Sequence, residues 1–237
     1  MKNIYSDIIH AGKRNQKLLA ILLDPDKIEW DTLDLITSKI ITSPATHILV
    51  GGSVVISERI DDYIRVIKEN CSLPVILFPG NPSQISSHAD GILFLSLISG
   101  RNPDFLIGHH VDAAPILDNT NLEIIPTGYI VIESGSRTAV SRVSQTDPML
   151  TDNPELIVNT ALAGQMLGNK LIYLEAGSGA HNPVPLEIIK SVSQSIDIPL
   201  IVGGGIKDKT GIEEAYASGA DMVVIGTAFE NDFHFFD

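Results

Sequence analysis

Three glycine-rich turns, each directly after an apolar run, constrain the fold of this chain more than any other feature. They read Tyr173-Leu-Glu-Ala-Gly-Ser-Gly179, Val202-Gly-Gly-Gly-Ile206 and Ile225-Gly-Thr-Ala228, and they lie about one β-α unit apart. Glycine lets backbone N–H groups approach an oxyanion closely, and a following helix N-terminus adds a favourable dipole. Turns of this kind on consecutive late strands predict a phosphate-binding site at the mouth of a (β/α)8 barrel.

Strand-like runs along the whole chain support this fold. Most are continuously apolar, as in parallel strands that are covered on both faces. The runs are Leu18–Leu23, His47–Val50, Pro74–Phe78, Gly91–Leu95, Leu122–Ile125 continuing to Val131, Lys170–Leu174, Pro199–Val202 and Asp221–Ile225. Helical patterns separate them at Ile28–Ser38, Glu58–Glu69, Pro103–Leu117, Asn153–Leu167, Pro185–Ser195 and Thr210–Ser218. The alternation predicts one α/β domain over residues 1–237, a (β/α)8 TIM barrel.

Two departures from a regular barrel are expected. The stretch between Gly80 and Asp90 is too short for a full helix, so the third barrel helix should be replaced by a loop or a short turn. The chain also continues only briefly after Gly226, which predicts a short or missing eighth helix. An amphipathic segment at Ile4–Arg14 is expected to cap the bottom of the barrel.

Composition narrows the function. A formal net charge of -13 argues against nucleic acid as a partner, because such binding needs clustered Lys and Arg. It does not exclude a phosphate site, since backbone amides and a metal ion can neutralise phosphate locally. No signal-peptide pattern and no apolar run long enough to span a bilayer is found, so we expect a soluble, cytoplasmic protein.

Candidate metal ligands follow the first two strands. Asp24 lies in Leu23-Asp-Pro-Asp-Lys27, and Ser53 ends Val50-Gly-Gly-Ser53. One carboxylate with few other protein ligands is typical of Mg²⁺ that is bound together with substrate phosphates. Asp24 could instead be the N-cap of the following helix, although Asp26 is the better placed cap.

Candidate catalytic residues follow the fifth and sixth strands. Tyr173 and Glu175 are two residues apart on one strand, so both side chains should point into the barrel mouth. A carboxylate beside the glycine-rich turn is poorly explained as a structural residue. Tyr129, in Pro126-Thr-Gly-Tyr129, could face a ligand or pack on the barrel rim.

At these motifs the chain resembles the geranylgeranylglyceryl phosphate synthase family, which includes bacterial heptaprenylglyceryl phosphate synthases. The motif Tyr173-Leu-Glu-Ala-Gly-Ser-Gly179 is the most specific part of the match, and Phe78-Pro-Gly80 and Ile225-Gly-Thr-Ala-Phe229 extend it over nearly the whole chain. The missing third helix also fits this family. The segment Ser99–Phe105 departs from the family pattern, which leaves the prenyl chain length open.

The resemblance implies a prenyltransferase that forms an ether between sn-glycerol 1-phosphate and a polyprenyl diphosphate, with geranylgeranyl diphosphate as the first choice. It implies Mg²⁺ at Asp24 and Ser53 and a homo-oligomer. From the residues themselves we expect catalytic roles for Glu175, Tyr173 and Tyr129. The residues that the resemblance implies for glycerol phosphate are Tyr173, Leu174, Glu175, Ala176, Gly177, Ser178, Gly179, Gly204, Gly205, Gly226 and Thr227.

The chemistry of this reaction agrees with the residues. A metal can stabilise the charge of a diphosphate leaving group, and Glu175 can accept the hydroxyl proton. The prenyl tail needs an apolar groove, for which we expect Phe94, Leu95 and Phe105 beside the missing helix. Two alternatives are another phosphate-binding barrel enzyme, such as a phosphosugar isomerase, and a non-catalytic barrel that binds a phosphometabolite.

Overall fold

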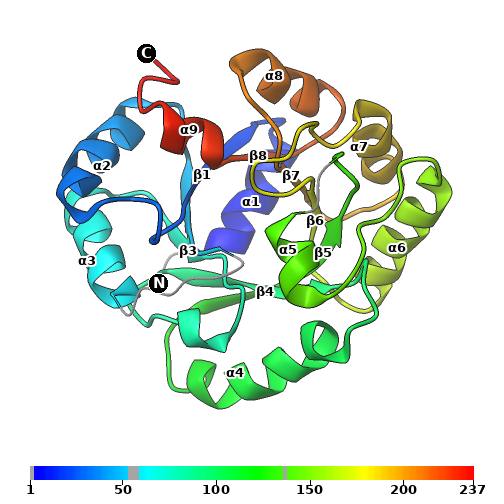
Figure 1. Cartoon of the computed structure of the whole chain (residues 1–237), viewed down its shortest axis with the longest axis horizontal. Coiled ribbons are helices and arrows are strands. Elements are labelled where there is room, and N and C mark those ends of the chain that lie inside the picture. The colour runs from blue at the N-terminus through cyan, green and yellow to red at the C-terminus, as the bar shows by residue number, and fades with distance from the viewer. Residues whose placement is uncertain (1–2, 53–58, 136–137) are drawn as a thin grey trace.

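A computed structural model describes residues 3–52, 59–135 and 138–237. Its strands form a closed barrel in sequence order, and every neighbouring pair is parallel (Figure 1). The strands are β1 (Leu18–Leu23), β2 (His47–Val50), β3 (Val75–Leu77), β4 (Gly91–Leu97), β5 (Glu123–Val131), β6 (Leu171–Glu175), β7 (Leu200–Gly203) and β8 (Met222–Ile225). The predicted barrel is therefore confirmed.

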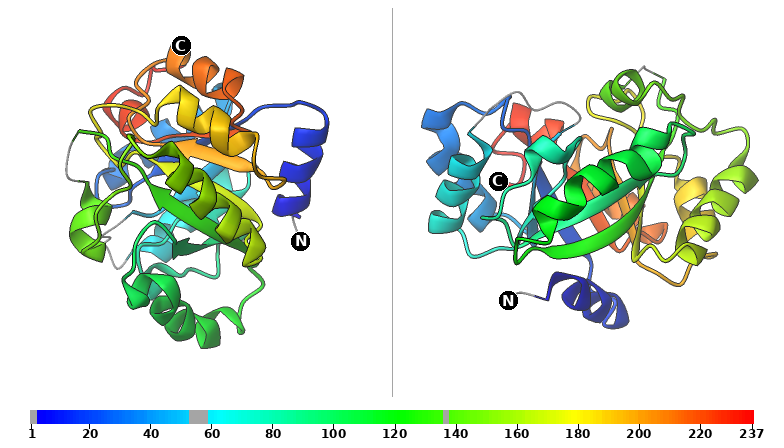
Figure 2. Two further views of the ribbon diagram at one scale, coloured as in Figure 1. Left: turned by 90° about the vertical axis from the view of Figure 1, so that its right-hand side faces the viewer. Right: turned by 90° about the horizontal axis from the view of Figure 1, so that it is seen from below.

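Helices surround the barrel and cover its outer face (Figure 1). They are α1 (Ile4–Lys13), α2 (Leu33–Thr42), α3 (Ile60–Asn70), α4 (His109–Leu117), α5 (Ala139–Ser144), α6 (Pro154–Met166), α7 (Leu186–Ser193), α8 (Lys209–Ala217) and α9 (Thr227–Asn231). Helices α1 and α5 are exceptions, because they lie at opposite ends of the barrel, α1 across its bottom and α5 beside its mouth (Figure 2). The Glu123 carboxylate at the start of β5 accepts the backbone N–H groups of Ile4 and Tyr5, which holds this cap in place as expected.

The core has two layers because the strands are buried on both faces. Inward-facing side chains such as Leu49, Ile76 and Ile201 fill the barrel together with Ile4 and Ile8 of α1. Outward-facing side chains pack against the surrounding helices in a larger second cluster. This arrangement fixes the strand ends rigidly, and the loops that carry the site extend from them.

The helical ring is interrupted where the sequence predicts it. Between β3 and β4, where every residue is described, the chain forms only the 3₁₀ turn Pro82–Gln84. The Asn81 side chain caps this turn by accepting the N–H of Ser83 at 2.8 Å. After β8 the helix α9 has five residues, so the eighth barrel helix is short.

Four local expectations were wrong or incomplete. The helix after β1 starts later than Ile28: a 3₁₀ turn covers Trp30–Thr32 and α2 follows it. Asp26 is not its cap, since Glu29 and Thr32 occupy the N-cap positions of these two elements. Helix α5 was not predicted, because it is too short for its apolar periodicity to be recognised. The segment before α4 begins as the π-helical turn Asp104–Gly108.

Within the described part of the chain, no helix combines the length and the apolar character needed to cross a membrane.

Candidate active site

The ends of β6, β7 and β8 bring the glycine-rich turns together. Glu175 pairs in register with Gly203, and the N–H of Ala176 donates to the carbonyl of Gly203 at 3.0 Å. Ser178 Oγ lies 3.3 Å from Thr227 Oγ1, which joins the first turn to the start of α9. The turns therefore form one continuous surface at the barrel mouth, as the spacing of the motifs predicts.

Two glycines are required where these turns meet. Gly204 has φ +80°, and a Cβ atom there would lie 2.3 Å from Glu175 Oε1 and 2.5 Å from the backbone nitrogen of Gly177. Gly177 has φ +104°, and its Cβ would lie 2.1 Å from Thr138 Cγ2. A side chain at Gly204 would displace the Glu175 carboxylate and the first turn, and one at Gly177 would displace Thr138, since no contact that short is tolerated.

Glu175 is the acidic group at the centre of this surface. Its Oε1 accepts the N–H of Gly177 at 2.6 Å, and the residue is only 6% exposed. Burial raises the pKa of the Glu175 carboxyl to about 7, although the Gly177 amide and the Tyr173 hydroxyl act in the opposite direction. A carboxyl group that titrates near neutral pH is suited to accept a proton from a substrate hydroxyl.

Tyr173 and Tyr129 pack beneath Glu175 inside the barrel. Their ring centroids are 5.4 Å apart in an edge-on arrangement, and each ring also contacts Phe78. Burial raises the pKa of both tyrosines, and the negative charge of Glu175 raises it further. Both phenols therefore stay neutral at physiological pH and can donate hydrogen bonds but cannot act as bases.

The remaining residues of the first turn divide by orientation. Leu174 and Ala176 belong to the outer core between strands and helices, so only their backbones can contribute to a ligand site. Ser178 and Gly179 are exposed at the mouth. Gly205 has φ +70° and turns the chain towards the carbonyl of Asn182.

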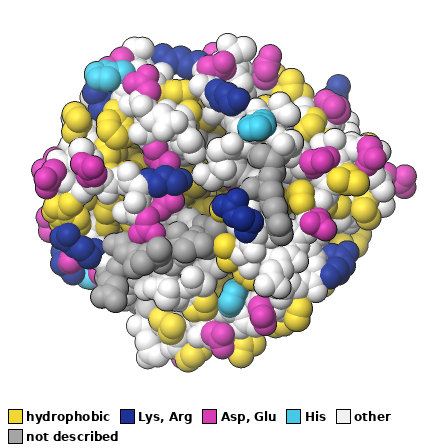
Figure 3. All heavy atoms as spheres, in the orientation of Figure 1, with side chains coloured by type: hydrophobic (Ala, Val, Ile, Leu, Met, Phe, Trp, Pro, Cys, Tyr) yellow, Lys and Arg dark blue, Asp and Glu magenta, His cyan; other side chains and the backbone are white. Residues whose placement is uncertain are grey.

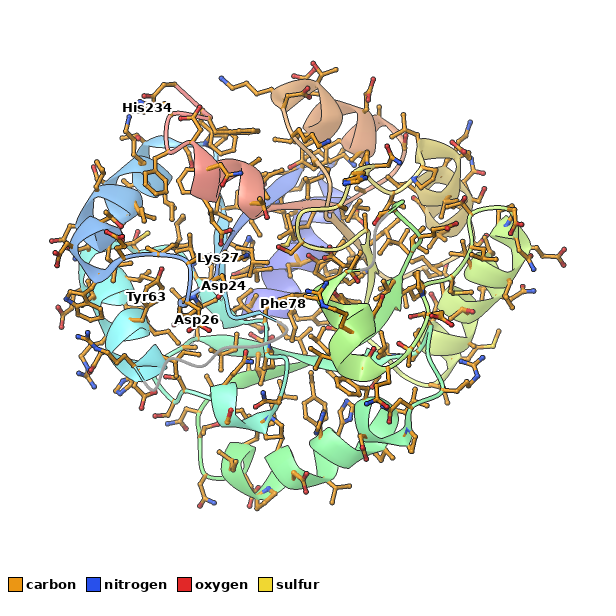
Figure 4. All side chains as sticks on the ribbon, viewed as in Figure 1. Asp24, Asp26, Lys27, Tyr63, Phe78 and His234 are labelled. Atoms are coloured by element: carbon orange, nitrogen blue, oxygen red, sulfur yellow. The ribbon has the colours of Figure 1, made fainter. Side chains whose placement is uncertain are left out.

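A charged cluster lies beside the turns, at the end of β1 (Figure 4). Lys27 Nζ is 3.2 Å from Asp24 Oδ2 and 3.4 Å from Glu230 Oε2. It also lies 3.3 Å from Ser178 Oγ, so the cluster touches the first glycine-rich turn. Figure 3 shows basic and acidic side chains side by side near the centre of this face.

The electrostatics of the cluster are set by its close packing. Burial lowers the pKa of Lys27, but the carboxylates of Glu230 and Asp24 outweigh it, so the pKa is raised and the ammonium is retained. Burial raises the pKa of Glu230, while Lys27 and the Asp24 N–H oppose that shift. The Asp24 carboxylate meanwhile accepts the N–H of Asp26 at 3.1 Å, which makes it the centre of a local turn.

The residues around Asp24 fit a hard cation such as Mg²⁺. A Cβ on Gly52 would lie 3.2 Å from Asp24 Oδ2, so the end of β2 reaches the carboxylate. Ser53, the second predicted ligand, lies outside the described residues. The buried Tyr63 hydroxyl has no hydrogen-bond partner in the described structure, and Glu230 and Asp24 help burial to raise its pKa. The Asp24 carboxylate is an oxygen ligand of the kind that Mg²⁺ prefers.

The described residues offer no full protein cage for that cation. Among residues 3–52, 59–135 and 138–237, no three His, Cys, Asp or Glu side chains are placed to hold a metal ion together. A cation at Asp24 would need further ligands from water or from substrate phosphate, as Mg²⁺ usually has.

An apolar pocket opens between β3 and β4, where the ring of helices around the barrel is interrupted. Phe94, Leu95 and Phe105 all line it, together with Phe78 and Tyr129. Helix α5 contributes Val140 and Val143, and α4 contributes His109, His110 and Ala113. The structure therefore brings the three predicted groove residues to one cavity, and Tyr129 connects that cavity to Tyr173 and Glu175.

Three contributors to the site were not predicted. Lys27 and Glu230 are charged residues at the ends of strand and helix, positions at which charge is usually solvated; only the fold shows that they meet. His110 interrupts the apolar pocket, where its Nε2 lies 3.0 Å from Ser96 Oγ and its ring packs edge-on against Phe94. Burial, and then the charge of His109, lowers the pKa of His110, which favours the neutral imidazole.

Glycine-rich turns and an acidic residue at the C-terminal strand ends define the class of (β/α)8-barrel proteins that bind phosphorylated small molecules. Comparison with known proteins narrows this class. The chain belongs to the PcrB family, whose model matches residues 13–237.

Several curated relatives carry the same name. The geranylgeranylglyceryl phosphate synthase of Flavobacterium johnsoniae is 63% identical over 237 residues, covering 100% of this chain and 98% of the relative. That of Thermococcus gammatolerans is 44% identical over 94% of this chain and 88% of its own length.

Solved structures of proteins with this name have a similar fold. The crystal structure of (S)-3-O-geranylgeranylglyceryl phosphate synthase from Thermoplasma acidophilum, in complex with its substrate sn-glycerol-1-phosphate, has a TM-score of 0.92 at 35% identity. The alignment covers 100% of this chain and 96% of that one. A tryptophan synthase α-subunit from Pyrococcus furiosus, with a TM-score of 0.59 at 13% identity over 91% of this chain and 88% of its own, shares the fold alone.

Proposed function

We propose that this protein is a prenyltransferase that joins sn-glycerol 1-phosphate to a polyprenyl diphosphate, with geranylgeranyl diphosphate as the preferred donor. The observation that carries the proposal is that the apolar pocket adjoins the glycine-rich turns. Tyr129 lines this pocket and packs on Tyr173, which is two residues from Glu175. The shared name of the relatives favours this reaction over a phosphosugar isomerase or a non-catalytic binding protein.

Different parts of the site bind the two substrates and the metal ion. Backbone amides of the turns at Gly177–Gly179, Gly204–Gly205 and Gly226–Thr227 hold the phosphate of glycerol phosphate. The apolar pocket holds the prenyl chain, and each buried CH₂ unit contributes about 0.8 kcal/mol. Asp24 would hold Mg²⁺, which when bound would stabilise negative charge on the diphosphate.

Glu175 is the proposed general base. As the bond between the prenyl carbon and the diphosphate oxygen breaks, its electron pair leaves with the diphosphate. The glycerol hydroxyl oxygen then forms the new ether bond, and its proton passes to Glu175. The short Glu175–Gly177 hydrogen bond fixes the carboxylate for this transfer.

The test is a product assay. Purified protein is incubated with sn-glycerol 1-phosphate, MgCl₂ and prenyl diphosphates of 15, 20 and 35 carbons, and the lipid product is identified by mass spectrometry. We expect the ether with the 20-carbon donor to form fastest, and sn-glycerol 3-phosphate to be a poor acceptor. No prenylated product from any donor would exclude the proposal.

We also propose that the protein is a homo-oligomer in which α4 and α6 make contacts between subunits. Apolar side chains are exposed on α4 (Val111, 64%), on the π-helical turn before it (Ile107, 59%) and on α6 (Met166, 80%). Sedimentation at micromolar concentration tests this: we expect at least a dimer, and Val111→Asp should weaken it. A wild-type monomer would disprove it.

A further inference from the structure

Glu230 occupies an unusual place for an acidic side chain. It comes from α9, near the other end of the chain from Asp24, and only 7% of its side chain is exposed. One carboxylate oxygen, Oε1, accepts the backbone N–H of Asp24 at 3.1 Å, and the other, Oε2, lies 3.4 Å from Lys27 Nζ. A single carboxylate thus holds both the backbone and the ammonium of the segment after β1.

The charges of the cluster do not cancel. Lys27 is shared between Asp24 and Glu230, so one ammonium faces two carboxylates and a net charge of about −1 remains. Both carboxylates are largely buried, whereas 46% of the Lys27 side chain is exposed. The interior of the cluster is therefore negative, and the side chain that can move is the cation.

We propose that Glu230 is a positioning residue for the cation site at Asp24: it engages Lys27 and thereby keeps the Asp24 carboxylate available to a divalent metal ion. This inference rests on the proposed magnesium role of Asp24.

Glu230 matters because Lys27 and a metal ion would compete for the Asp24 carboxylate. Lys27 and a metal ion both bind the Asp24 carboxylate, and the ammonium is already 3.2 Å from it. With Glu230 ionised, Lys27 keeps a carboxylate partner when the metal takes Asp24, and it stays 3.3 Å from Ser178 Oγ beside the phosphate site. Without that charge, releasing Asp24 would leave Lys27 with only a neutral hydroxyl among these contacts, so the ion pair would oppose metal binding.

The matched variants are Glu230→Gln and Glu213→Gln. Glutamine retains an oxygen that can accept the Asp24 N–H but loses the charge that holds Lys27. Glu213 is an exposed residue of α8, so its replacement makes the same change in net charge at a distance from the cluster. Melting temperature without metal shows whether either variant is misfolded.

The probe is MnCl₂ alone, whose binding to each full-length protein is followed by water-proton relaxation; Mn²⁺ takes the same oxygen ligands as Mg²⁺. Partners of metal ligands typically contribute 10–100-fold to affinity, so we expect Glu230→Gln to weaken Mn²⁺ binding about tenfold or more. Glu213→Gln should leave it unchanged. An unchanged affinity in Glu230→Gln would overturn the proposal.

A double variant separates competition from simple structural support. Removing the competing ammonium should restore the metal site, so Lys27→Met with Glu230→Gln should bind Mn²⁺ within about threefold of the wild type. If the double variant binds as weakly as Glu230→Gln, Lys27 is not the competitor and the proposal fails. Asp24→Ala tests the underlying assignment: wild-type Mn²⁺ affinity there would refute the cation site itself, whereas its loss together with unaltered binding in Glu230→Gln would refute only the role of Glu230.

Discussion

The Glu175 carboxylate accepts the Gly177 backbone N–H at 2.6 Å, so the residue expected to take a proton also fixes the first turn of the phosphate site. Glu175 lies at the end of β6, and Gly204 on the neighbouring turn leaves room for it only because it has no side chain. Catalytic and binding groups are therefore coupled through one contact.

Glu175→Gln should lose about 10²–10⁴-fold in kcat, the usual contribution of a general base. Glutamine preserves the shape and can still accept the Gly177 N–H, so the fold and the phosphate site should persist. Initial rates at saturating substrates measure the effect, with the exposed Glu187→Gln as a control. A loss below about tenfold would reduce Glu175 to a minor substrate contact.

The same substitution should stabilise the folded protein at high pH. Burial raises the pKa of Glu175 from 4.5 to about 7, so between these values the folded protein binds more protons than the unfolded chain. The contribution of Glu175 to the free energy of unfolding is therefore fully present below pH 4.5 and is lost as the pH rises to about 7. The lost amount is about 3 kcal/mol for a shift of this size.

Urea unfolding at several pH values measures the contribution of Glu175 to the free energy of unfolding. Glu175→Gln should match the wild type near pH 4.5 and exceed its free energy of unfolding by up to about 3 kcal/mol at pH 8, because glutamine carries no charge to bury. Comparing two proteins that differ at one position cancels the titration of all other groups. A difference independent of pH would show that Glu175 ionises normally.

Asp24→Ala should abolish activity while the barrel remains folded. The backbone N–H of residue 24 can still donate to Glu230, so the segment after β1 keeps an anchor. Asp26→Ala, which removes an exposed carboxylate two residues away, is the control and should retain activity. Rates are measured over a MgCl₂ titration together with circular dichroism; full turnover in Asp24→Ala would make that residue purely structural.

The sequence predicts this fold well because the determining signals are local. Continuous apolar runs define the strands, and the short interval between Gly80 and Asp90 excludes a helix regardless of tertiary context. The face of Tyr173 and Glu175 follows from strand alternation alone.

What could not be predicted depends on contacts between distant segments. Aspartate is a common helix cap, which favoured Asp26, but the helix after β1 begins only after the turn at Trp30–Thr32. Glu230 is about 200 residues from Lys27 along the chain, and no periodicity connects them. The raised pKa of Glu175 likewise results from burial, which the motif does not encode.

Phe105 offers a test of the prenyl site. Its ring lines the apolar pocket, packs edge-on against His109 with centroids 4.8 Å apart, and remains partly exposed in the π-helical turn. Replacing it with alanine should lengthen the pocket, and each additional buried CH₂ unit of a longer donor would contribute about 0.8 kcal/mol. Phe105→Ala should therefore shift preference towards longer prenyl diphosphates.

The measurement is the ratio of kcat/KM values for donors of 15, 20 and 35 carbons, with the affinity for glycerol phosphate determined separately. That affinity should stay nearly unchanged, because Phe105 lies in the apolar pocket and is absent from the glycine-rich turns. Phe235→Ala, which removes a partly buried ring from the C-terminal aromatic cluster, controls for a general loss of packing. An unchanged ratio accompanied only by a lower melting temperature would assign Phe105 to the packing of the segment before α4, and the end of the prenyl site would then have to lie elsewhere along the pocket.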